Sequence, residues 1–183
     1  MRIVGVVPGA KLFGSEDLYA DHYLFVNGYP KRIAACGGTP IGILSSDGSV
    51  IPEALTLCDS FVFCGGARFY PYHFQVMEYA ARSGKPVLGI CLGMQIATIE
   101  FARDVAGISD AHSSEFDEQC KHKVIDFMPG QSDEIDKGGT LRLGACPCEI
   151  QSGTTMERCY GTLEISERHR HRYEFNNDYR QAL

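Results

Sequence analysis

The sequence predicts an α/β fold in which a mainly parallel sheet is covered by helices on both faces. Short apolar, mostly β-branched runs alternate with helix-length segments through the first hundred residues. Parallel strands need crossover connections of that length, and helices usually supply them. The 183 residues are enough to bury a core, and 44% hydrophobic content with 22% charged residues is ordinary for a globular protein. We therefore expect a single domain over residues 1–183.

The individual elements follow from apolar runs, apolar spacing and stop signals. Four runs predict strands at residues 2–8, 40–44, 60–64 and 86–90. Three segments have helical length, at residues 18–35, 72–83 and 94–106. The first is interrupted at Pro30, and the second ends at Gly84 with Pro86 close behind, which is a helix stop signal.

The texture of the sequence changes after residue 107. Residues 108–140 are polar and rich in turn residues, and short extended runs follow at 140–148 and 159–166. A charged stretch then covers residues 167–173. We interpret this part as a small β-ribbon flap appended to the α/β core.

Composition excludes several classes of function. The net charge of −6 argues against nucleic acid or an anionic membrane as a partner, and no apolar run is long enough to span a membrane or to form a signal peptide. Eight cysteines in this context predict reduced, core-like thiols in a cytoplasmic protein. Cys146-Pro147-Cys148 lacks the spacing of a zinc site, so we expect no metal and no cofactor.

The most informative segment joins a predicted strand to a predicted helix. Residues 89–93 read Gly-Ile-Cys-Leu-Gly, the pattern of a nucleophile elbow that carries cysteine instead of serine. Cys91 would stand at the start of a helix, where the helix N-terminus favours a thiolate. Taken alone, the pattern is equally compatible with an ordinary strand-to-helix turn that holds a buried cysteine.

A thiol that cleaves a carboxamide also needs hydrogen-bond donors for the tetrahedral oxyanion. The backbone N–H of Leu92 follows the nucleophile and can supply one. A second can come from the diglycine turn Gly65-Gly66 after the strand at 60–64. A diglycine is usually only a loop, but both segments close parallel strands at their carboxyl ends, where ligand sites form on such sheets.

At this point the sequence resembles the class I, or triad-type, glutamine amidotransferases. The C-terminal half resembles the glutaminase domain of CTP synthase, and the N-terminal half resembles γ-glutamyl-γ-aminobutyrate hydrolases. The former resemblance rests on residues 89–95, 99–103, 113–116, 137–144 and 167–177, and the latter on residues 27–30, 34–40 and the diglycine turn. The family implies a three-layer, flavodoxin-like sandwich with a β-ribbon flap.

The resemblance also implies a role for each matching residue. Cys91 would be the nucleophile, with the N–H groups of Gly66 and Leu92 forming the oxyanion hole. The substrate would be glutamine or a γ-glutamyl amide, which carries one cation and one anion. Glu115 would bind its ammonium group and Arg172 its α-carboxylate. The implied substrate-binding set is Gly65, Gln95, Glu115 and Arg172.

One expected feature of the family is missing. The triad ends in a His-x-Glu pair, and no such pair occurs in this sequence. The six histidines are His22, His73, His112, His122, His169 and His171, and we interpret His73 as a surface residue at a helix start. Three explanations stay open: a natural short form with impaired activity, a fragment of a longer chain, or a site completed by a partner.

The sequence therefore supports three hypotheses of different classes. The first is a hydrolase that cleaves the γ-carboxamide of glutamine or a γ-glutamyl amide through a Cys91 thioester. The second is a non-catalytic subunit that binds γ-glutamyl ligands, and the third is a structural relic with an inert thiol. A synthetase partner or a homo-oligomer is compatible with each of the first two, because the chain contains no nucleoside-triphosphate motif of its own.

Overall fold

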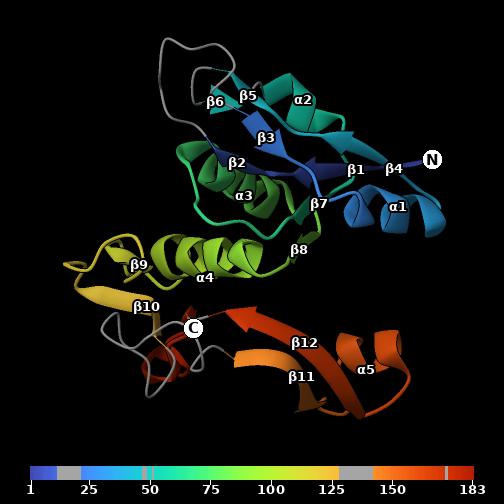
Figure 1. Cartoon of the computed structure of the whole chain (residues 1–183). Coiled ribbons are helices and arrows are strands. Elements are labelled where there is room, and N and C mark those ends of the chain that lie inside the picture. Colours follow the sequence, from blue (N-terminus) through green and yellow to red (C-terminus); the bar gives the residue numbers. More distant parts are fainter. Residues whose placement is uncertain (12–21, 47–48, 51, 128–141, 172) are drawn as a thin grey trace. The chain divides into compact units, whose positions relative to one another are not determined.

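The computed structural model describes residues 1–11, 22–46, 49–50, 52–127, 142–171 and 173–183. Contacts between residues divide the chain into two compact units (Figure 1). The first unit comprises Met1–Ile125 and Phe175–Leu183, and the second comprises Asp126–Glu174. The single domain expected from the sequence stays a prediction.

The first unit is built on a four-stranded sheet whose paired strands all run parallel. Its order is β4 (Gly38–Gly42), β1 (Arg2–Val7), β7 (Ser60–Phe63) and β8 (Val87–Gly89). Counted along the chain as first to fourth, these strands lie in the order 2-1-3-4, which is the flavodoxin-like arrangement. The predicted α/β fold with a parallel sheet is confirmed, and all four predicted strands are present with ends shifted by no more than two residues.

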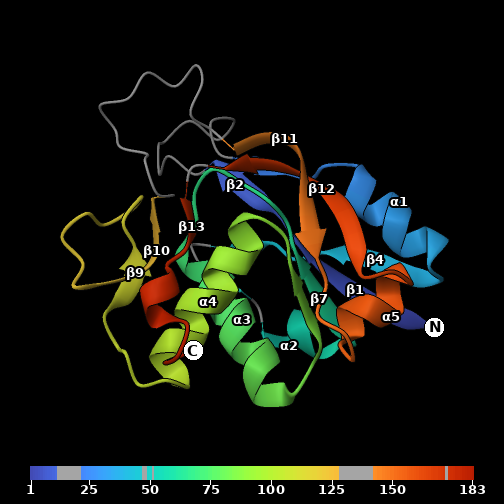
Figure 2. The ribbon, with the colours of Figure 1, turned by 90° about the horizontal axis from the view of Figure 1, so that it is seen from below.

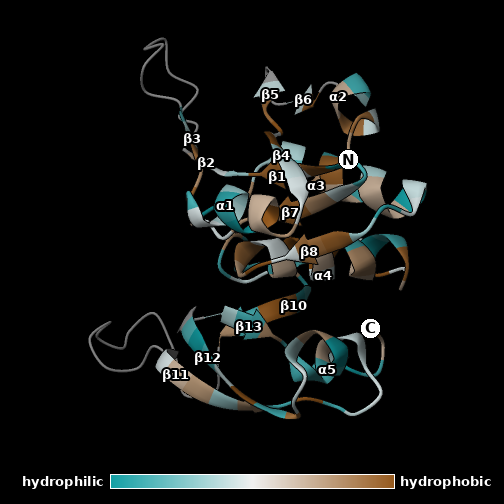
Figure 3. Cartoon of the chain, turned by 90° about the vertical axis from the view of Figure 1, so that its right-hand side faces the viewer, coloured by the Kyte–Doolittle hydropathy of each residue, from teal (hydrophilic) through white to brown (hydrophobic). Residues whose placement is uncertain are grey.

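The two faces of this sheet carry different helices. Phe61 and Phe63 belong to the buried core together with Tyr72 and Val76 of α3 (Pro71–Ser83). Val62, between them, points to the opposite face because successive strand side chains alternate. There it lines an apolar groove of about 620 Å³ together with Ile33 of α1 (Gly28–Ala35). Figure 3 shows hydrophobic colours along the central strands β1 and β7.

The groove corrects one expectation about the fourth strand. The sequence predicts that residues 86–90 are buried, but Leu88 is 57% exposed and Ile90 is 36% exposed. Both side chains line the groove on the α1 face, where α1 packs against β4 and β1 rather than over β8. On the other face, β8 packs against α4 (Leu92–Asp104), which lies beside α3 (Figure 2).

The predicted helix at residues 18–35 is much too long. Within the described residues, α1 begins at Gly28, and β3 (His22–Leu24) pairs with β2 (Gly9–Lys11) in an antiparallel hairpin before it. Pro30 explains the difference, because proline is tolerated in the first turn of a helix but removes a hydrogen bond and clashes in the interior. The helix therefore begins only two residues before Pro30.

The other two helix predictions are close to the observed elements. α3 ends at Ser83, and Gly84 adopts the left-handed conformation with φ 65°, as the Gly-then-Pro signal predicts. α4 begins at Leu92, two residues before the predicted start. The remaining short elements of the first unit are β5 (Ser45–Ser46), β6 (Ser49–Val50), α2 (Pro52–Thr56), β9 (Ala111–Ser113) and the 3-10 helix Asn177–Tyr179. Strand β10 (His122–Phe127) begins in the first unit and ends in the second.

Two strands within the region 108–140 escaped prediction. β9 and β10 pair in parallel, and β10 lies between β9 and β13 (Tyr173–Phe175) in a three-stranded sheet. Both strands are short and contain polar residues. Their fully buried hydrophobic residues are Ala111, Val124 and Ile125. Strands β10 and β13 lead from the first unit into the second and back.

The second unit contains the predicted β-ribbon. Strands β11 (Arg142–Glu149) and β12 (Glu164–His171) are antiparallel, with Cys146 opposite Glu167. The extended run predicted at 159–166 is partly wrong, because Cys159 lies in α5 (Thr155–Tyr160). Thr154 caps that helix by accepting a hydrogen bond from Glu157 N at 3.3 Å, and Gly161 ends it in the left-handed conformation.

No helix in the described part of the chain combines the length and apolar character that a membrane span requires.

The junction between β8 and α4 is packed so closely that only glycine fits at two positions. A Cβ atom placed on Gly93 would lie 2.6 Å from both Phe63 Cβ and Phe63 O, and one placed on Gly89 would lie 2.6 Å from Gly93 O. The start of α4 therefore sits directly against the end of β7. Side chains at either glycine would push the helix away from the sheet.

Glu100 is a buried carboxyl group on α4 with 8% exposure. Burial raises its pKa to about 7, and the nearby carboxylates of Asp104 and Glu78 add to this effect, while Arg103 opposes it. A proton bound at Glu100 therefore favours the folded state. Its stabilising effect is complete below the ordinary value of 4.5 and is lost as the pH rises to about 7.

We expect Glu100→Gln to increase the melting temperature at pH 8 and to leave it almost unchanged at pH 4.5. The neutral amide removes the cost of burying a carboxylate, which we put at about 2 kcal/mol above pH 7. Thermal melting followed by circular dichroism across this pH range measures the effect. The exposed Glu118→Gln is the matched control, and identical pH profiles for the two variants would refute the argument.

We expect Gly93→Ala to destabilise the first unit by about 3 kcal/mol, because the new methyl group overlaps Phe63. Gly28→Ala is the control, since a Cβ there would meet only a Val26 side-chain atom at 4.0 Å. Its free energy of unfolding should change by about 0.5 kcal/mol or less. Denaturation followed by circular dichroism suits this chain, which has no tryptophan. Equal stability of the two variants would contradict the close packing.

Candidate active site

Cys91 occupies a strained turn between strand β8 and helix α4. Its φ is 56° and its ψ is −109°, and it has the only positive φ among the described residues other than glycine. Its carbonyl oxygen accepts hydrogen bonds from Met94 N at 3.0 Å and Gln95 N at 3.2 Å, so it begins the helix. Backbone conformations of this kind cost of order 1–3 kcal/mol and persist only where the surroundings hold them.

This turn presents the sulfur of Cys91 to solvent. The residue is exposed and its thiol is free. The buried cysteines of the first unit differ sharply, because burial raises the pKa of Cys64 to about 11 and also raises that of Cys58. The prediction that the cysteines are core-like is therefore wrong for four exposed residues, Cys36, Cys91, Cys148 and Cys159.

The diglycine turn lies directly beside Cys91. A Cβ atom on Gly65 would be 3.4 Å from Cys91 Cβ and 3.9 Å from Cys91 Sγ, and one on Gly66 would be 3.0 Å from a Leu92 side-chain carbon. Gly9, just after β1, approaches the same turn, since a Cβ there would be 3.4 Å from Gly65 O. The carboxyl ends of β1, β7 and β8 thus converge at the point where the strand order changes direction, the usual ligand position in such sheets.

Two backbone donors at this point are free. Within the described residues, the N–H groups of Gly66 and Leu92 have no hydrogen-bond partner. Leu92 is the first residue of α4, whose initial N–H groups cannot bond within the helix. The N–H of Gly65 is different, because it donates to the hydroxyl of Tyr29 at 3.2 Å.

Gln95 lies one turn into α4 and is buried with 6% exposure. Among the described residues, no group donates a hydrogen bond to its Oε1 atom. A buried acceptor without a donor lowers the stability of the folded state by about 1–3 kcal/mol, so a buried unbonded oxygen at this position needs an explanation. A ligand beside Cys91 that carries N–H groups would provide one.

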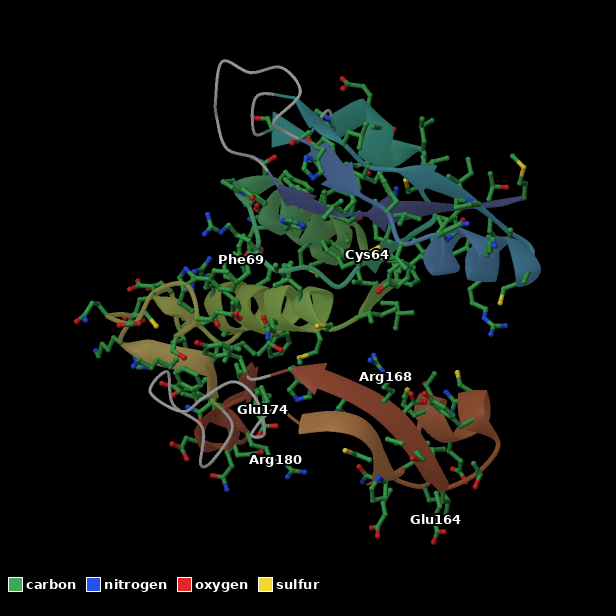
Figure 4. The ribbon with its side chains drawn as sticks, viewed as in Figure 1. Cys64, Phe69, Glu164, Arg168, Glu174 and Arg180 are labelled. Atoms are coloured by element: carbon green, nitrogen blue, oxygen red, sulfur yellow. The ribbon has the colours of Figure 1, made fainter. Side chains whose placement is uncertain are left out.

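The segment that carries Glu115 packs against the loop after the diglycine turn. Phe116 lies 4.1 Å, centroid to centroid, from Phe69, which follows Gly66 by three residues. Figure 4 labels Cys64 and Phe69, which stand on either side of this turn in the sequence. Glu115 itself is exposed, and its N–H donates to Ser113 Oγ at 3.3 Å.

Arg172 lies outside the described residues. The structure thus brings Cys91, Leu92, Gly65 and Gly66 together, with Gln95 one turn away.

His73 is not the surface residue that the sequence suggested. It is 2% exposed, its Nδ1 accepts a hydrogen bond from Tyr70 N at 2.9 Å, and its Nε2 lies 3.0 Å from Pro8 O. These partners identify the neutral tautomer with the proton on Nε2. Burial lowers the pKa of His73 to about 4. Together with Tyr72, whose hydroxyl also donates to Pro8 O at 2.6 Å, it ties α3 to the end of β1.

Two further imidazoles of the first unit have partners of their own. Nδ1 of His112 accepts from Ser113 N at 2.8 Å, and burial, followed by the charge of Arg103, lowers its pKa. His122 lies 3.0 Å from Tyr179 Oη. Within the described residues, no hydrogen bond joins Cys91 Sγ to an imidazole. The described part of the chain also holds no group of three His, Cys, Asp or Glu side chains suited to a metal ion.

Sequence reasoning did not assign a role to Tyr29. It noted the residue only within the segment 27–30 that resembles γ-glutamyl-γ-aminobutyrate hydrolases. The contact with Gly65 joins residues that are 36 positions apart, so no local pattern reports it.

Comparison with known proteins gives a consistent result. The family "Glutamine amidotransferase class-I" matches residues 49–182. The CTP synthase of Staphylococcus saprophyticus is 49% identical over 135 residues, which cover 73% of this chain and 25% of that protein. The CTP synthase of Staphylococcus aureus strain JH9 is 49% identical over 133 residues, which cover 72% of this chain and 25% of that protein. The chain thus spans about a quarter of the length of these curated relatives.

A solved structure supports the same assignment over the whole chain. The glutaminase domain of Trypanosoma brucei CTPS, with bound acivicin, matches with a TM-score of 0.74 and 27% identity, covering 100% of this chain and 71% of that one. These findings confirm the predicted resemblance to CTP synthase, while the resemblance of the N-terminal half to γ-glutamyl-γ-aminobutyrate hydrolases stays a prediction. The chain belongs to the class I glutamine amidotransferase family.

Proposed function

We propose that this chain hydrolyses the γ-carboxamide of glutamine or of a γ-glutamyl amide through a thioester on Cys91. The observation that carries the proposal is the exposed thiol at a strained helix start, in contact with a diglycine turn. Such strain is concentrated at functional sites because it holds a reactive group in a fixed direction. A packed, inert cysteine would need neither the exposure nor the strain.

The proposed reaction has two steps. The sulfur of Cys91 releases its proton to water and bonds to the carbonyl carbon, and the C=O electron pair moves onto oxygen, where the N–H groups of Gly66 and Leu92 stabilise the charge. When the carbonyl re-forms, the C–N bond breaks and the amine leaves with a proton from water. A second water then attacks the thioester, which releases glutamate and restores the thiol.

The remaining proposed contacts hold the amino-acid end of the substrate. Glu115 accepts the ammonium group and Arg172 binds the α-carboxylate, while Gly65 and Gln95 line the side-chain pocket. The Oε1 atom of Gln95 supports this, because it has no donor among the described residues and a substrate amide would supply one.

The proposed domain would work in the cytoplasm and pass its ammonia to another domain or subunit. Residues 1–183 form a single class I amidotransferase-like domain that works in the cytoplasm, where its free cysteines stay reduced. Because the curated relatives, about three times as long as this chain, are CTP synthases, the ammonia would pass to a synthetase domain, to a separate subunit or to another copy of the chain.

A second candidate is a subunit that binds γ-glutamyl ligands without turning them over. It is favoured by one observation, namely that no imidazole in the described residues is hydrogen-bonded to the thiol. General acid–base help is worth about 10²–10⁴ in rate, so its loss slows the exit of the amine.

Incubation of the pure protein with glutamine and with γ-glutamyl-γ-aminobutyrate tests the two candidates. We expect glutamate and ammonia to form slowly with the wild type, and no product with Cys91→Ala. Calorimetry with both variants measures binding independently of turnover. Binding without product would favour the non-catalytic subunit, and neither binding nor product would exclude both functions.

A further inference from the structure

The hydroxyl of Tyr29 reaches the candidate site from a helix that has no other part in it. Tyr29 is the second residue of α1 and is half-buried. Its N–H donates to Val26 O at 3.0 Å, and Pro30 follows, so the first turn of the helix is rigid. Because α1 packs against β4 and β1, it holds the phenol at the edge of the sheet where β7 ends.

The hydrogen bond at this edge has a defined direction. The N–H of Gly65 donates to the phenolic oxygen at 3.2 Å. Within the described residues, the hydroxyl proton of Tyr29 has no acceptor of its own. A phenol that accepts one hydrogen bond becomes a better donor in another, since bonded groups polarise each other. The geometry therefore leaves an activated O–H donor beside the diglycine turn.

The hydroxyl of Tyr29 and the thiol of Cys91 both lie close to Gly65. The position of a Cβ on Gly65 lies 3.7 Å from the Tyr29 oxygen, 3.9 Å from Cys91 Sγ and 3.4 Å from Cys91 Cβ. The phenolic oxygen and the sulfur therefore both lie within 4 Å of one point beside Gly65. A carbonyl group bonded to this sulfur would bring its oxygen close to that point.

We propose that Tyr29 is a catalytic residue that donates its hydroxyl proton in a hydrogen bond to the oxyanion formed at Cys91. This rests on the function proposed above and changes the assignment of the diglycine turn. The N–H of Gly65 positions the phenol, whereas the N–H groups of Gly66 and Leu92 stay free for the oxyanion. The proton remains on the tyrosine throughout, and no bond to it is broken.

A plain structural role for Tyr29 predicts different behaviour. If the phenol only closed the turn, its removal would free the N–H of Gly65 and add a donor to the site. The rate would then rise or stay constant in Tyr29→Phe. A role as oxyanion donor requires the rate to fall, because loss of one such donor typically costs 10²–10³ in rate.

The test compares two reagents that alkylate Cys91. With a γ-glutamyl chloromethyl ketone, the sulfur first adds to the carbonyl carbon and creates an oxyanion. The sulfur then bonds to the neighbouring methylene carbon and displaces chloride, its bond to the carbonyl carbon breaks and the C=O bond re-forms, which leaves the thioether. Iodoacetamide reacts by direct displacement of iodide and creates no oxyanion. The ratio of the two rate constants therefore reports oxyanion stabilisation and cancels changes in thiol reactivity.

We expect this ratio to fall about 100-fold in Tyr29→Phe, with the iodoacetamide rate and the melting temperature unchanged. Tyr79→Phe is the matched control, because its hydroxyl also accepts a hydrogen bond, from Lys85 Nζ at 3.3 Å. A ratio in Tyr29→Phe equal to or above the wild-type value overturns the inference.

Turnover of glutamine is measured in parallel to separate the two proposals. If glutamine is not turned over but the ratio still depends on Tyr29, the proposed hydrolysis is excluded and the proposed oxyanion donor is supported. If Tyr29→Phe turns glutamine over at the wild-type rate, Tyr29 is excluded as an oxyanion donor and the proposed hydrolysis is supported.

Discussion

The conformation of the candidate site depends on one packing constraint, the close approach of the start of α4 to the end of β7. Gly93 touches Phe63 at a distance that excludes any side chain, and Gly89 touches Gly93 in the same way. This contact leaves Cys91 between the two glycines in a conformation with φ 56° that it would not adopt alone. The direction of the thiol is therefore set by the hydrophobic core and the sheet, and not by contacts of the thiol itself.

The same constraint organises the groups around the sulfur. Because β7 and β8 end side by side, the diglycine turn after β7 lies next to the turn after β8. Gly9, which follows β1, approaches the same diglycine turn. Tyr72 and His73 fix this corner from α3 by bonding to Pro8 O. A buried neutral histidine in such a place is a structural hydrogen-bonding group, which explains why it does not serve the thiol.

Much of this arrangement could be predicted because its signals are local. The spacing of glycines around Cys91, the diglycine after an apolar run and the Gly-then-Pro stop of α3 each report a conformation within a few residues. The position of α5 was also readable, since Thr154 and Glu157 have the spacing of a helix start and Gly161 that of a helix end. The predicted extended run at 159–166 overlaps the end of this helix, which extends over Thr155–Tyr160.

The contacts that escaped prediction join distant segments. Tyr29 meets Gly65 only because α1 begins at Gly28, and the predicted helix from residue 18 would have placed the phenol mid-helix with no defined partner. The burial of His73 likewise depends on Pro8, 65 residues earlier. Strands β9 and β10 carry too few apolar residues to stand out from the turns around them.

The most direct test of the central claim is mass spectrometry of the protein quenched in acid during incubation with glutamine. Attack of water on the thioester also lacks acid–base help from the described imidazoles, so hydrolysis of the thioester should be slow. One γ-glutamyl group should therefore accumulate, and peptide mapping should place it on Cys91. The exposed thiols of Cys36, Cys148 and Cys159 serve as internal controls in the same molecule. An unmodified protein, or a γ-glutamyl group shared among these exposed cysteines, would contradict a nucleophile built by the strained turn.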